Sequence, residues 1–297
     1  MVLPALVACM SSPATPARLA DVEPAHADLR LVVVGDSGHV NATARRVAAS
    51  VTTVCAERGC DALVLLGDNL YPRGLTSEAD PDAAFGPWLA TGLPVYGVLG
   101  NHDWGHGHDQ DAAAAQVAWS HATPGLHVAQ DWTMRAGPAT LVGLDTTRVF
   151  WDGPDRAAWL HDALDAAEGW RVVLGHHPFR SNGPHGNAGS YEGWSGIPWL
   201  SGRSLQSVFD DALCGHADLY LSGHDHSRQW LQHCGVQLIV SGAGSSATHL
   251  VDRGNEPVFA AAEHGFVWLS LGPQLTVAFH DEHGRVEHEG VAGPPRR

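Results

Sequence analysis

Basic residues are scarce in this 297-residue chain, which holds 17 lysine and arginine residues against 32 aspartate and glutamate residues. The formal net charge is -15 at pH 7, with the 20 histidines counted as neutral. Binding of nucleic acid through a general surface needs clustered positive charge, so the composition argues against a nucleic-acid surface. An acidic protein can still attract an anion locally, where bound metal ions reverse the charge inside a cleft.

Long apolar runs are lacking too. No stretch beyond the N-terminal region is long and apolar enough to span a membrane. Cysteine is sparse, with five residues, and the last four have no C-x-x-C spacing, which argues against a zinc site or a redox motif. An even set of four in an exported protein predicts disulfides. We expect a local bridge between Cys55 and Cys60, and by elimination a second between Cys214 and Cys234.

The N-terminus starts with a short apolar run, residues 3–8, that ends at Cys9. The sequence Leu-Val-Ala-Cys resembles the lipobox of bacterial lipoproteins, in which the cysteine is lipidated after cleavage. Residues 11–20, rich in Ser, Pro, Ala and Thr, then have the composition of a tether. We expect an exported protein of the bacterial periplasm or cell envelope with a lipid anchor at Cys9; the alternative is a disordered tail with an accidental cysteine.

Beyond the tether, apolar runs and helical patterns alternate. We assign residues 1–28 to the N-terminal signal and tether, and residues 29–297 to a single domain. Helices are expected near 41–58 (with Asn41 as the N-cap), 81–90, 110–120, 155–168 and before 213. Strands are expected near 30–35, 62–66, 94–99, 139–144, 171–175, 217–222, 228–233, 236–241, 264–271 and 274–280. Helical crossovers followed by hairpins predict an α/β fold with one mixed sheet or two packed sheets.

Five short polar segments each follow an apolar run that is typical of a strand. They are Gly35-Asp36-Ser37-Gly38, Gly67-Asp68-Asn69-Leu70-Tyr71, Gly100-Asn101-His102-Asp103, Val173-Leu174-Gly175-His176 and Gly223-His224-Asp225-His226. The carboxyl ends of strands in α/β proteins converge on a ligand-binding edge of the sheet. A mixed set of Asp, Asn, His and Tyr suits two adjacent hard or borderline cations better than one structural zinc.

The oxygen donors of these segments have distinct expected roles. Asp36 and Asp68 follow neighbouring strands, so that one carboxylate binds a single ion and the other bridges two. Tyr71 lies three residues after Asp68, which brings its phenol toward the same ion, and a strongly Lewis-acidic ion such as Fe(III) favours tyrosinate. Asn101 offers an amide oxygen.

The expected roles of the histidines depend on the directions in which neighbouring side chains point. His102 points away from Asn101 and is free for proton or phosphate chemistry, with Asp103 placed to fix its tautomer by a hydrogen bond. His224 and His226 point the same way on an extended segment, so both reach a two-metal site.

Adjacent side chains point in different directions, which limits the number of ligands in two of the segments. His176 and His177 are neighbours, so we expect only one of them to be a ligand. Asp225, between the two histidines of the last segment, faces away from the ions.

Together the motifs resemble the calcineurin-like metallophosphoesterase superfamily, and the form Gly67-Asp68-x-x-Tyr71 is similar to that of the purple acid phosphatases. Gly175-His176-His177-Pro178, continuing to His185-Gly186, resembles their small tartrate-resistant type. The resemblance implies a four-layer α/β/β/α sandwich of two mixed β-sheets flanked by helices. For Fe(III) it implies the ligands Asp36, Asp68, Tyr71 and His226. For a second divalent ion (Fe, Zn or Mn), which Asp68 also bridges, it implies Asn101, His176 and His224.

The resemblance further implies that His102 and His185 contact the substrate phosphate. The expected function is that of a monomeric acid phosphatase that hydrolyses small phosphomonoesters by direct attack of a metal-bound hydroxide. A phosphodiesterase or nucleotidase on the same metals is the first alternative, for which residues 187–203 would shape substrate access. The second is a surface lipoprotein that binds phosphate or metal without turnover.

Overall fold

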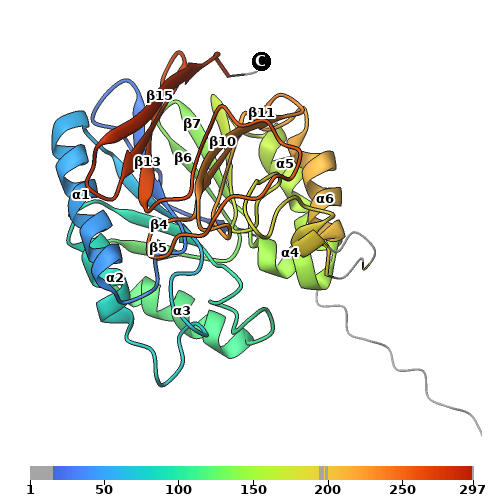
Figure 1. Ribbon diagram of the computed structural model, residues 1–297, viewed down its shortest axis with the longest axis horizontal. Helices are drawn as coiled ribbons and strands as arrows, with labels where there is room; N and C mark the ends of the chain where they lie inside the picture. Colours follow the sequence, from blue (N-terminus) through green and yellow to red (C-terminus); the bar gives the residue numbers. More distant parts are fainter. Residues whose placement is uncertain (1–15, 194–196, 198–199, 296–297) are drawn as a thin grey trace, which may run out of the picture.

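In the computed structural model, which describes residues 16–193, 197 and 200–295, two β-sheets lie face to face and helices cover both outer sides (Figure 1). The predicted α/β/β/α sandwich is therefore confirmed. Cys9 and the lipobox-like residues fall outside the described residues. Within the part of the chain that the structure describes, no helix has the length and apolar character needed to cross a bilayer.

The first sheet has seven strands in the order β15-β14-β13-β2-β3-β4-β5, of which β2 to β5 are parallel and β13 to β15 antiparallel. The strands are β2 (Leu29–Val34), β3 (Ala62–Leu66), β4 (Val95–Val98), β5 (Leu126–Val128), β13 (Gly265–Leu271), β14 (Leu275–Asp281) and β15 (Val286–Ala292). Continuous apolar runs such as that of β3 are typical of parallel strands, because both of their faces are buried.

The second sheet has eight strands in the order β1-β6-β7-β8-β9-β11-β10-β12. Its central strands β7, β8, β9 and β11 are parallel, and β10 pairs with β11 as an antiparallel hairpin. The strands are β1 (Ala17–Arg18), β6 (Trp132–Ala136), β7 (Ala139–Gly143), β8 (Trp170–Leu174), β9 (Leu219–Ser222), β10 (Arg228–His233), β11 (Val236–Ser241) and β12 (Phe259–Ala261).

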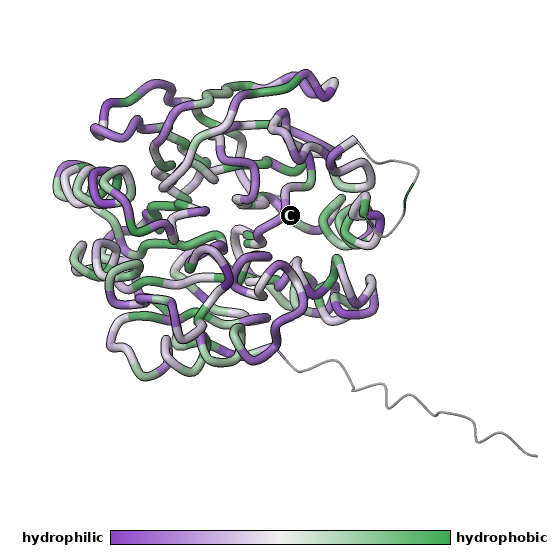
Figure 2. Tube along the Cα trace, turned by 60° about the horizontal axis from the view of Figure 1, so that its bottom comes forward, coloured by the Kyte–Doolittle hydropathy of each residue, from purple (hydrophilic) through white to green (hydrophobic). Residues whose placement is uncertain are grey.

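Side-chain alternation along the strands creates three apolar layers. In β2, Leu31 and Val33 point into the core between the two sheets, whereas Val32 and Val34 pack under the helices of the first sheet. In Figure 2, hydrophobic stretches run through the middle of the fold and hydrophilic residues gather in the outer loops. All four of these side chains are fully buried. A shift of β2 by one residue would exchange the two faces, so its register is fixed, and with it the residue at which the following loop begins.

Helices α1, α2 and α3 cover the first sheet, and α4, α5 and α6 cover the second (Figure 1). As predicted, Asn41 is the N-cap of α1, and its side-chain oxygen accepts the backbone N–H of Ala44 at 2.8 Å. The helices are α1 (Ala42–Arg58), α2 (Pro81–Leu89), α3 (Gln110–Ala122), α4 (Thr146–Asp152), α5 (Trp159–Asp165) and α6 (Arg203–Val208), with 3-10 turns at Pro154–Ala157 and Tyr191–Gly193 and a π-helical turn at Phe209–Leu213.

Several elements differ from the sequence expectations. The helix expected over 155–168 is a 3-10 turn followed by α5, because the chain enters α5 through Ala158 without a side-chain cap. Helix α4 was not predicted, since its residues Thr-Thr-Arg-Val-Phe-Trp favour strands by intrinsic propensity. Strand β15 was missed because it is a polar edge strand, whose position depends on pairing with β14.

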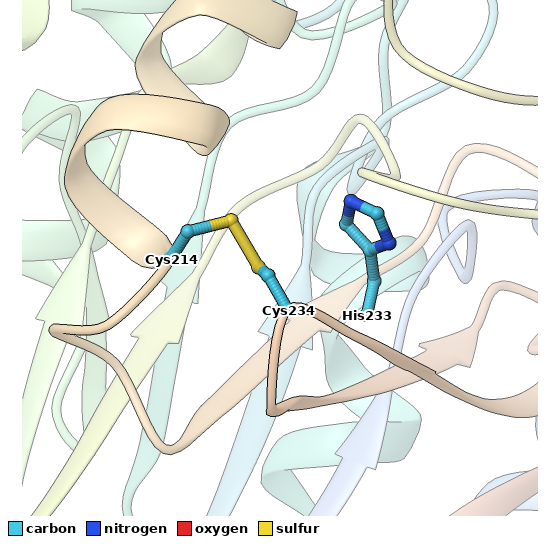
Figure 3. A group of neighbouring side chains, drawn as sticks. All are labelled: Cys214, His233 and Cys234. Atoms are coloured by element: carbon cyan, nitrogen blue, oxygen red, sulfur yellow. A yellow bond between two sulfur atoms is a disulfide. The ribbon is translucent and has the colours of Figure 1, made fainter.

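Both predicted disulfides are present. Cys55–Cys60 joins the end of α1 to the turn before β3, and Cys214–Cys234 joins the π-helical turn to the β10–β11 hairpin (Figure 3). His233 lies beside the second bridge. Both sulfurs of this cluster are bonded to each other, so neither is a thiolate available to a metal.

Two buried carboxylates lie together under α4. An Asp131 oxygen accepts the backbone N–H of Asp145 at 2.9 Å, and the Asp145 carboxylate accepts the indole N–H of Trp104 at 2.9 Å and caps α4. Burial raises the pKa of Asp131 to about 6 even though Arg156 lies 3.9 Å away. Burial, and then the charge of Asp131, raise the pKa of Asp145 to about 7, against the nearby guanidinium of Arg148.

This pair is predicted to contribute more to the stability of the fold at acid pH than at neutral pH. A folded pKa above the unfolded value of about 3.9 means that the folded state binds more protons. The contribution to stability is thus complete below about pH 4 and is lost as the pH rises through 6 to 7. Asp131→Asn, which keeps the oxygen that accepts from Asp145, should raise the free energy of unfolding by about 1–3 kcal/mol at pH 7.5.

Urea unfolding at pH 4.5, 6.0 and 7.5 measures this effect, and the stabilisation by Asp131→Asn should shrink toward pH 4.5. Asp210→Asn removes the same charge from an exposed carboxylate and serves as the control. Equal effects of Asp131→Asn at all three pH values would show that Asp131 is ionised throughout.

Candidate metal centre

The polar segments meet at one edge of the sandwich, where the carboxyl ends of parallel strands from both sheets adjoin. Asp36 and Asp68 each lie two residues beyond β2 and β3, and both have a φ of 53°. His176 and His224 lie two residues beyond β8 and β9 of the other sheet. The centre therefore lies between the two sheets, with donors from each.

Glycines allow this close approach of loops. A Cβ at Gly100 would lie 2.2 Å from an Asp68 carboxylate oxygen, and one at Gly223 would lie 2.5 Å from an Asp36 oxygen. Any side chain at these two positions would displace the carboxylates.

One group of donor atoms surrounds the phenol of Tyr71. Its oxygen lies 3.3 Å from Asp36 Oδ1, 3.1 Å from Asp68 Oδ2 and 3.4 Å from His226 Nε2. His226 Nε2 also lies 3.3 Å from Asp36 Oδ1. We call these four side chains the tyrosine group.

A second group surrounds Nε2 of the fully buried His176. This nitrogen lies 3.0 Å from Asn101 Oδ1, 3.1 Å from His224 Nδ1 and 3.4 Å from Asp68 Oδ2. We call these the histidine group. All seven side chains predicted as ligands are thus brought together, and the two groups share a single atom, Asp68 Oδ2.

The separations fit donors around shared ions. Ligand bonds of about 2.0–2.2 Å at cis angles place neighbouring donors about 3.0–3.5 Å apart. His176 Nδ1 lies 2.9 Å from the carbonyl oxygen of Leu66, which only accepts, so Nδ1 carries the proton and Nε2 presents its lone pair. That lone pair faces carboxylate and amide oxygens, an arrangement that a cation between them satisfies.

Electrostatics also favour a cation. Burial lowers the pKa of His176, but the carboxylates of Asp68 and Asp36 outweigh it and raise that pKa to about 10. Burial raises the pKa of Asp68, yet His176 and His102 bring it below its ordinary value. This field holds a second proton on the buried imidazole at Nε2, and a metal ion would take the place of that proton at the same nitrogen. Burial and neighbouring imidazoles lower the pKa of His224, which stays neutral with a free lone pair.

His102 lies beside the tyrosine group without joining it. Its backbone N–H donates to Asp68 Oδ1 at 2.8 Å, and its ring Nδ1 donates to the Pro72 carbonyl oxygen at 2.7 Å. Nε2, 3.9 Å from Asp68 Oδ2, is therefore the ring nitrogen on the side of the centre.

The predicted hydrogen bond between Asp103 and the His102 ring is wrong. The Asp103 carboxylate is buried and accepts backbone N–H groups of Gly100, Asn69 and Leu70 at 2.8–3.0 Å. Asp103 ties the loop after β3 to the loop after β4, because it accepts backbone N–H groups from both loops. The Pro72 carbonyl, not Asp103, sets the tautomer of His102.

His185 lies beside the histidine group, with its ring centroid 4.1 Å from that of His224. Its Nδ1 donates to Glu192, a residue that the sequence analysis did not single out. As predicted, Asp225 is in neither donor group; its carboxylate accepts the backbone N–H of His185 at 2.9 Å and that of Gly186 at 3.1 Å. Glu192 lies in a glycine-rich loop without periodicity, so no sequence signal marked it.

His177 is not in either donor group. Its Nδ1 lies 3.0 Å from the Thr146 hydroxyl, and its ring centroid lies 4.4 Å from that of His224. Of the two adjacent histidines, the structure brings His176 to the centre and leaves His177 in the adjoining wall.

Comparison with known proteins identifies relatives of this chain. The family description Calcineurin-like phosphoesterase matches residues 29–242. Purple acid phosphatase 3 of Arabidopsis thaliana is 27% identical over 94% of this chain and 81% of its own length. Tartrate-resistant acid phosphatase type 5 of Oryctolagus cuniculus is 28% identical over 86% of this chain and 88% of its own. The solved structure of GAP50, the anchor in the inner membrane complex of Plasmodium, shares the fold, with a TM-score of 0.69 at 17% identity over 91% of this chain and 90% of that one.

The shared oxygen predicts how metal content responds to substitution. We expect two metal ions per wild-type chain. Asp36→Asn and His224→Ala, which each alter one group, should each leave one tightly bound ion, whereas Asp68→Ala should weaken both. Elemental analysis after dialysis against a weak chelator measures this, with the exposed His283→Ala as control. Loss of both ions from His224→Ala would contradict two separate groups.

Proposed function

Because the chain belongs to the calcineurin-like phosphoesterase family, we propose that it is a binuclear metal-dependent acid phosphatase that hydrolyses phosphomonoesters. The observation that carries the proposal is the single oxygen, Asp68 Oδ2, common to the tyrosine group and the histidine group. A carboxylate oxygen shared in this way would hold two ions close enough to act on one phosphate.

The donor sets differ in the ions they fit. Burial and the carboxylates of Asp68 and Asp36 raise the pKa of Tyr71 well above its ordinary value, so only a strongly Lewis-acidic ion such as Fe(III) would hold it as tyrosinate. The amide and two imidazoles of the histidine group suit a divalent ion, Fe, Zn or Mn. When bound, such a pair polarises the phosphoryl oxygens and supplies the nucleophile.

Two histidines lie beside this centre, His102 next to Tyr71 and His185 next to His224. His102 is tied to the Pro72 carbonyl and His185 to Glu192 through Nδ1, so each ring has Nε2 available for substrate. In this proposal both rings act in the imidazolium form, in which Nε2 donates to the phosphoryl oxygens and gives its proton to the leaving alcohol. Glu192 is then a positioning residue, since its carboxylate fixes the orientation and tautomer of the His185 ring.

A non-catalytic binding protein is a weaker reading of the same site. A protein that only holds metal or phosphate has no need of His102 and His185 beside a complete donor set. The two disulfides agree with export into an oxidising compartment, which we also propose for this chain. Assays of the metal-loaded protein on phosphomonoesters and phosphodiesters test the function, and a preference for diesters would contradict it.

Tyrosinate bound to Fe(III) gives a visible charge-transfer band, and we expect the iron-loaded protein to be coloured. Tyr71→Phe keeps the ring, which stacks on His39 at 3.9 Å, and should lose the colour while the fold is retained. Absorption and circular dichroism spectra measure both. A colourless wild-type protein with Fe(III) bound would exclude Tyr71 as a ligand.

His102→Ala should keep both metals and lower kcat/KM by roughly 10²–10⁴-fold, the usual contribution of a positioned acid or base. The reason is that His102 Nε2 faces the substrate side of the centre, whereas its ring is absent from both donor groups. Metal analysis and steady-state kinetics of the same preparation separate the two effects. His121→Ala, at the exposed end of α3, is the control. Near-wild-type turnover or loss of metal in His102→Ala would contradict this role.

A further inference from the structure

A cavity of about 330 Å³ opens beside the histidine group. Its lining includes Asn101 and His224 of that group together with His185, so a phosphate at the centre would have its ester oxygen directed at this space or at solvent. The remaining lining residues are His106, Phe150, Trp151, His177, Tyr191, Glu192 and Leu200.

Aromatic rings form the wall of this cavity. The ring centroid of Phe150 lies 5.0 Å from that of Trp151, 5.5 Å from His177 and 6.2 Å from Tyr191, with the last pair nearly parallel at 17°. Tyr191 is 2% exposed, whereas Trp151 is 37% exposed at the mouth. The wall thus presents ring faces and edges to whatever enters.

The rings are held before any ligand arrives. A Cβ at Gly107 would lie 2.0 Å from the indole nitrogen of Trp151, and one at Gly202 would lie 2.3 Å from the ring of Tyr191. The Tyr191 hydroxyl donates to the Pro178 carbonyl. Close packing of this kind reduces the entropy lost on binding.

Charge restricts the occupant. Among the described residues that line the cavity there is no arginine or lysine, and Glu192 contributes the one carboxylate. A second phosphate or a carboxylate on the substrate would therefore meet no guanidinium or ammonium group and one carboxylate. The volume is about twice that of a cavity known to hold benzene, near 150 Å³, which leaves room for one or two rings.

We propose that this cavity binds the alcohol part of the substrate and selects phosphomonoesters of uncharged aromatic alcohols with one or two rings. The inference rests on the proposed phosphomonoesterase function, and it names the substrate class of that site. Contacts between aromatic rings are worth more than the area they bury, which gives an expected preference of about tenfold over a saturated ring of the same size.

Binding of non-hydrolysable phosphonates tests the inference without requiring turnover. Calorimetry on the metal-loaded full chain compares benzylphosphonate and 2-naphthylmethylphosphonate with cyclohexylmethylphosphonate. We expect the two aromatic ligands to bind about tenfold more tightly. A benzylphosphonate with a para-carboxylate should lose most of this advantage. The 5′-methylenephosphonate of adenosine is compared with benzylphosphonate. Tighter binding of the former indicates that the substrate alcohol is a nucleoside, and tighter binding of the latter indicates a simple aromatic alcohol.

Variants of Trp151 test whether the aromatic preference comes from the wall of this cavity. Trp151→Leu should reduce the aromatic preference at least threefold, and Trp151→Phe should retain it, with inorganic phosphate affinity and metal content unchanged in both. Trp119→Leu, on α3 away from the cavity, is the matched control.

Equal affinity for the aromatic and saturated phosphonates, or an unchanged preference in Trp151→Leu, would overturn the inference. If the preference holds but no phosphomonoester is hydrolysed, the proposed catalytic function fails and the assignment of the aromatic cavity stands. The two failures are thereby distinguished.

Discussion

Two like-charged carboxylates, Asp36 and Asp68, are buried almost completely and lie against the same phenol. Removing such charges from water is costly unless they are paired, and this requirement governs the surrounding structure. Backbone N–H groups from His102 and His224 donate to the two carboxylates, and imidazoles surround their remaining oxygens. The loops of both sheets are therefore shaped to compensate one concentration of negative charge.

Two further buried carboxylates act as connections between loops rather than as donors to an ion. Asp103 joins the loops after β3 and β4, and Asp225 holds the segment that carries His185. Each directly follows a histidine of a predicted motif. In both motifs the histidine faces the centre or its rim, while the adjacent acid binds backbone N–H groups behind it.

The sequence predicted the parts of this arrangement that depend on local order. Donors such as Asp68 and His176 were recognisable because each follows a strand-like apolar run through a glycine, and the strand ends then fix their location. Glu192 and the true partners of Asp103 were not recognisable, because both depend on loops that meet only in the folded chain. Helix α4 was missed for a similar reason, since tertiary packing overrides the strand propensity of its residues.

The positions of the donors and of the aromatic wall have a consequence for evolution of the chain. The acidic donors and Tyr71 follow strands of the first sheet, whereas Phe150, Trp151 and Tyr191 belong to α4 and a loop of the second. Substitutions can accumulate in the wall without disturbing the oxygens that hold the ions. In the proposed function, the part of the substrate that the wall contacts and the oxygen donors of the first sheet would therefore be set by separate stretches of sequence.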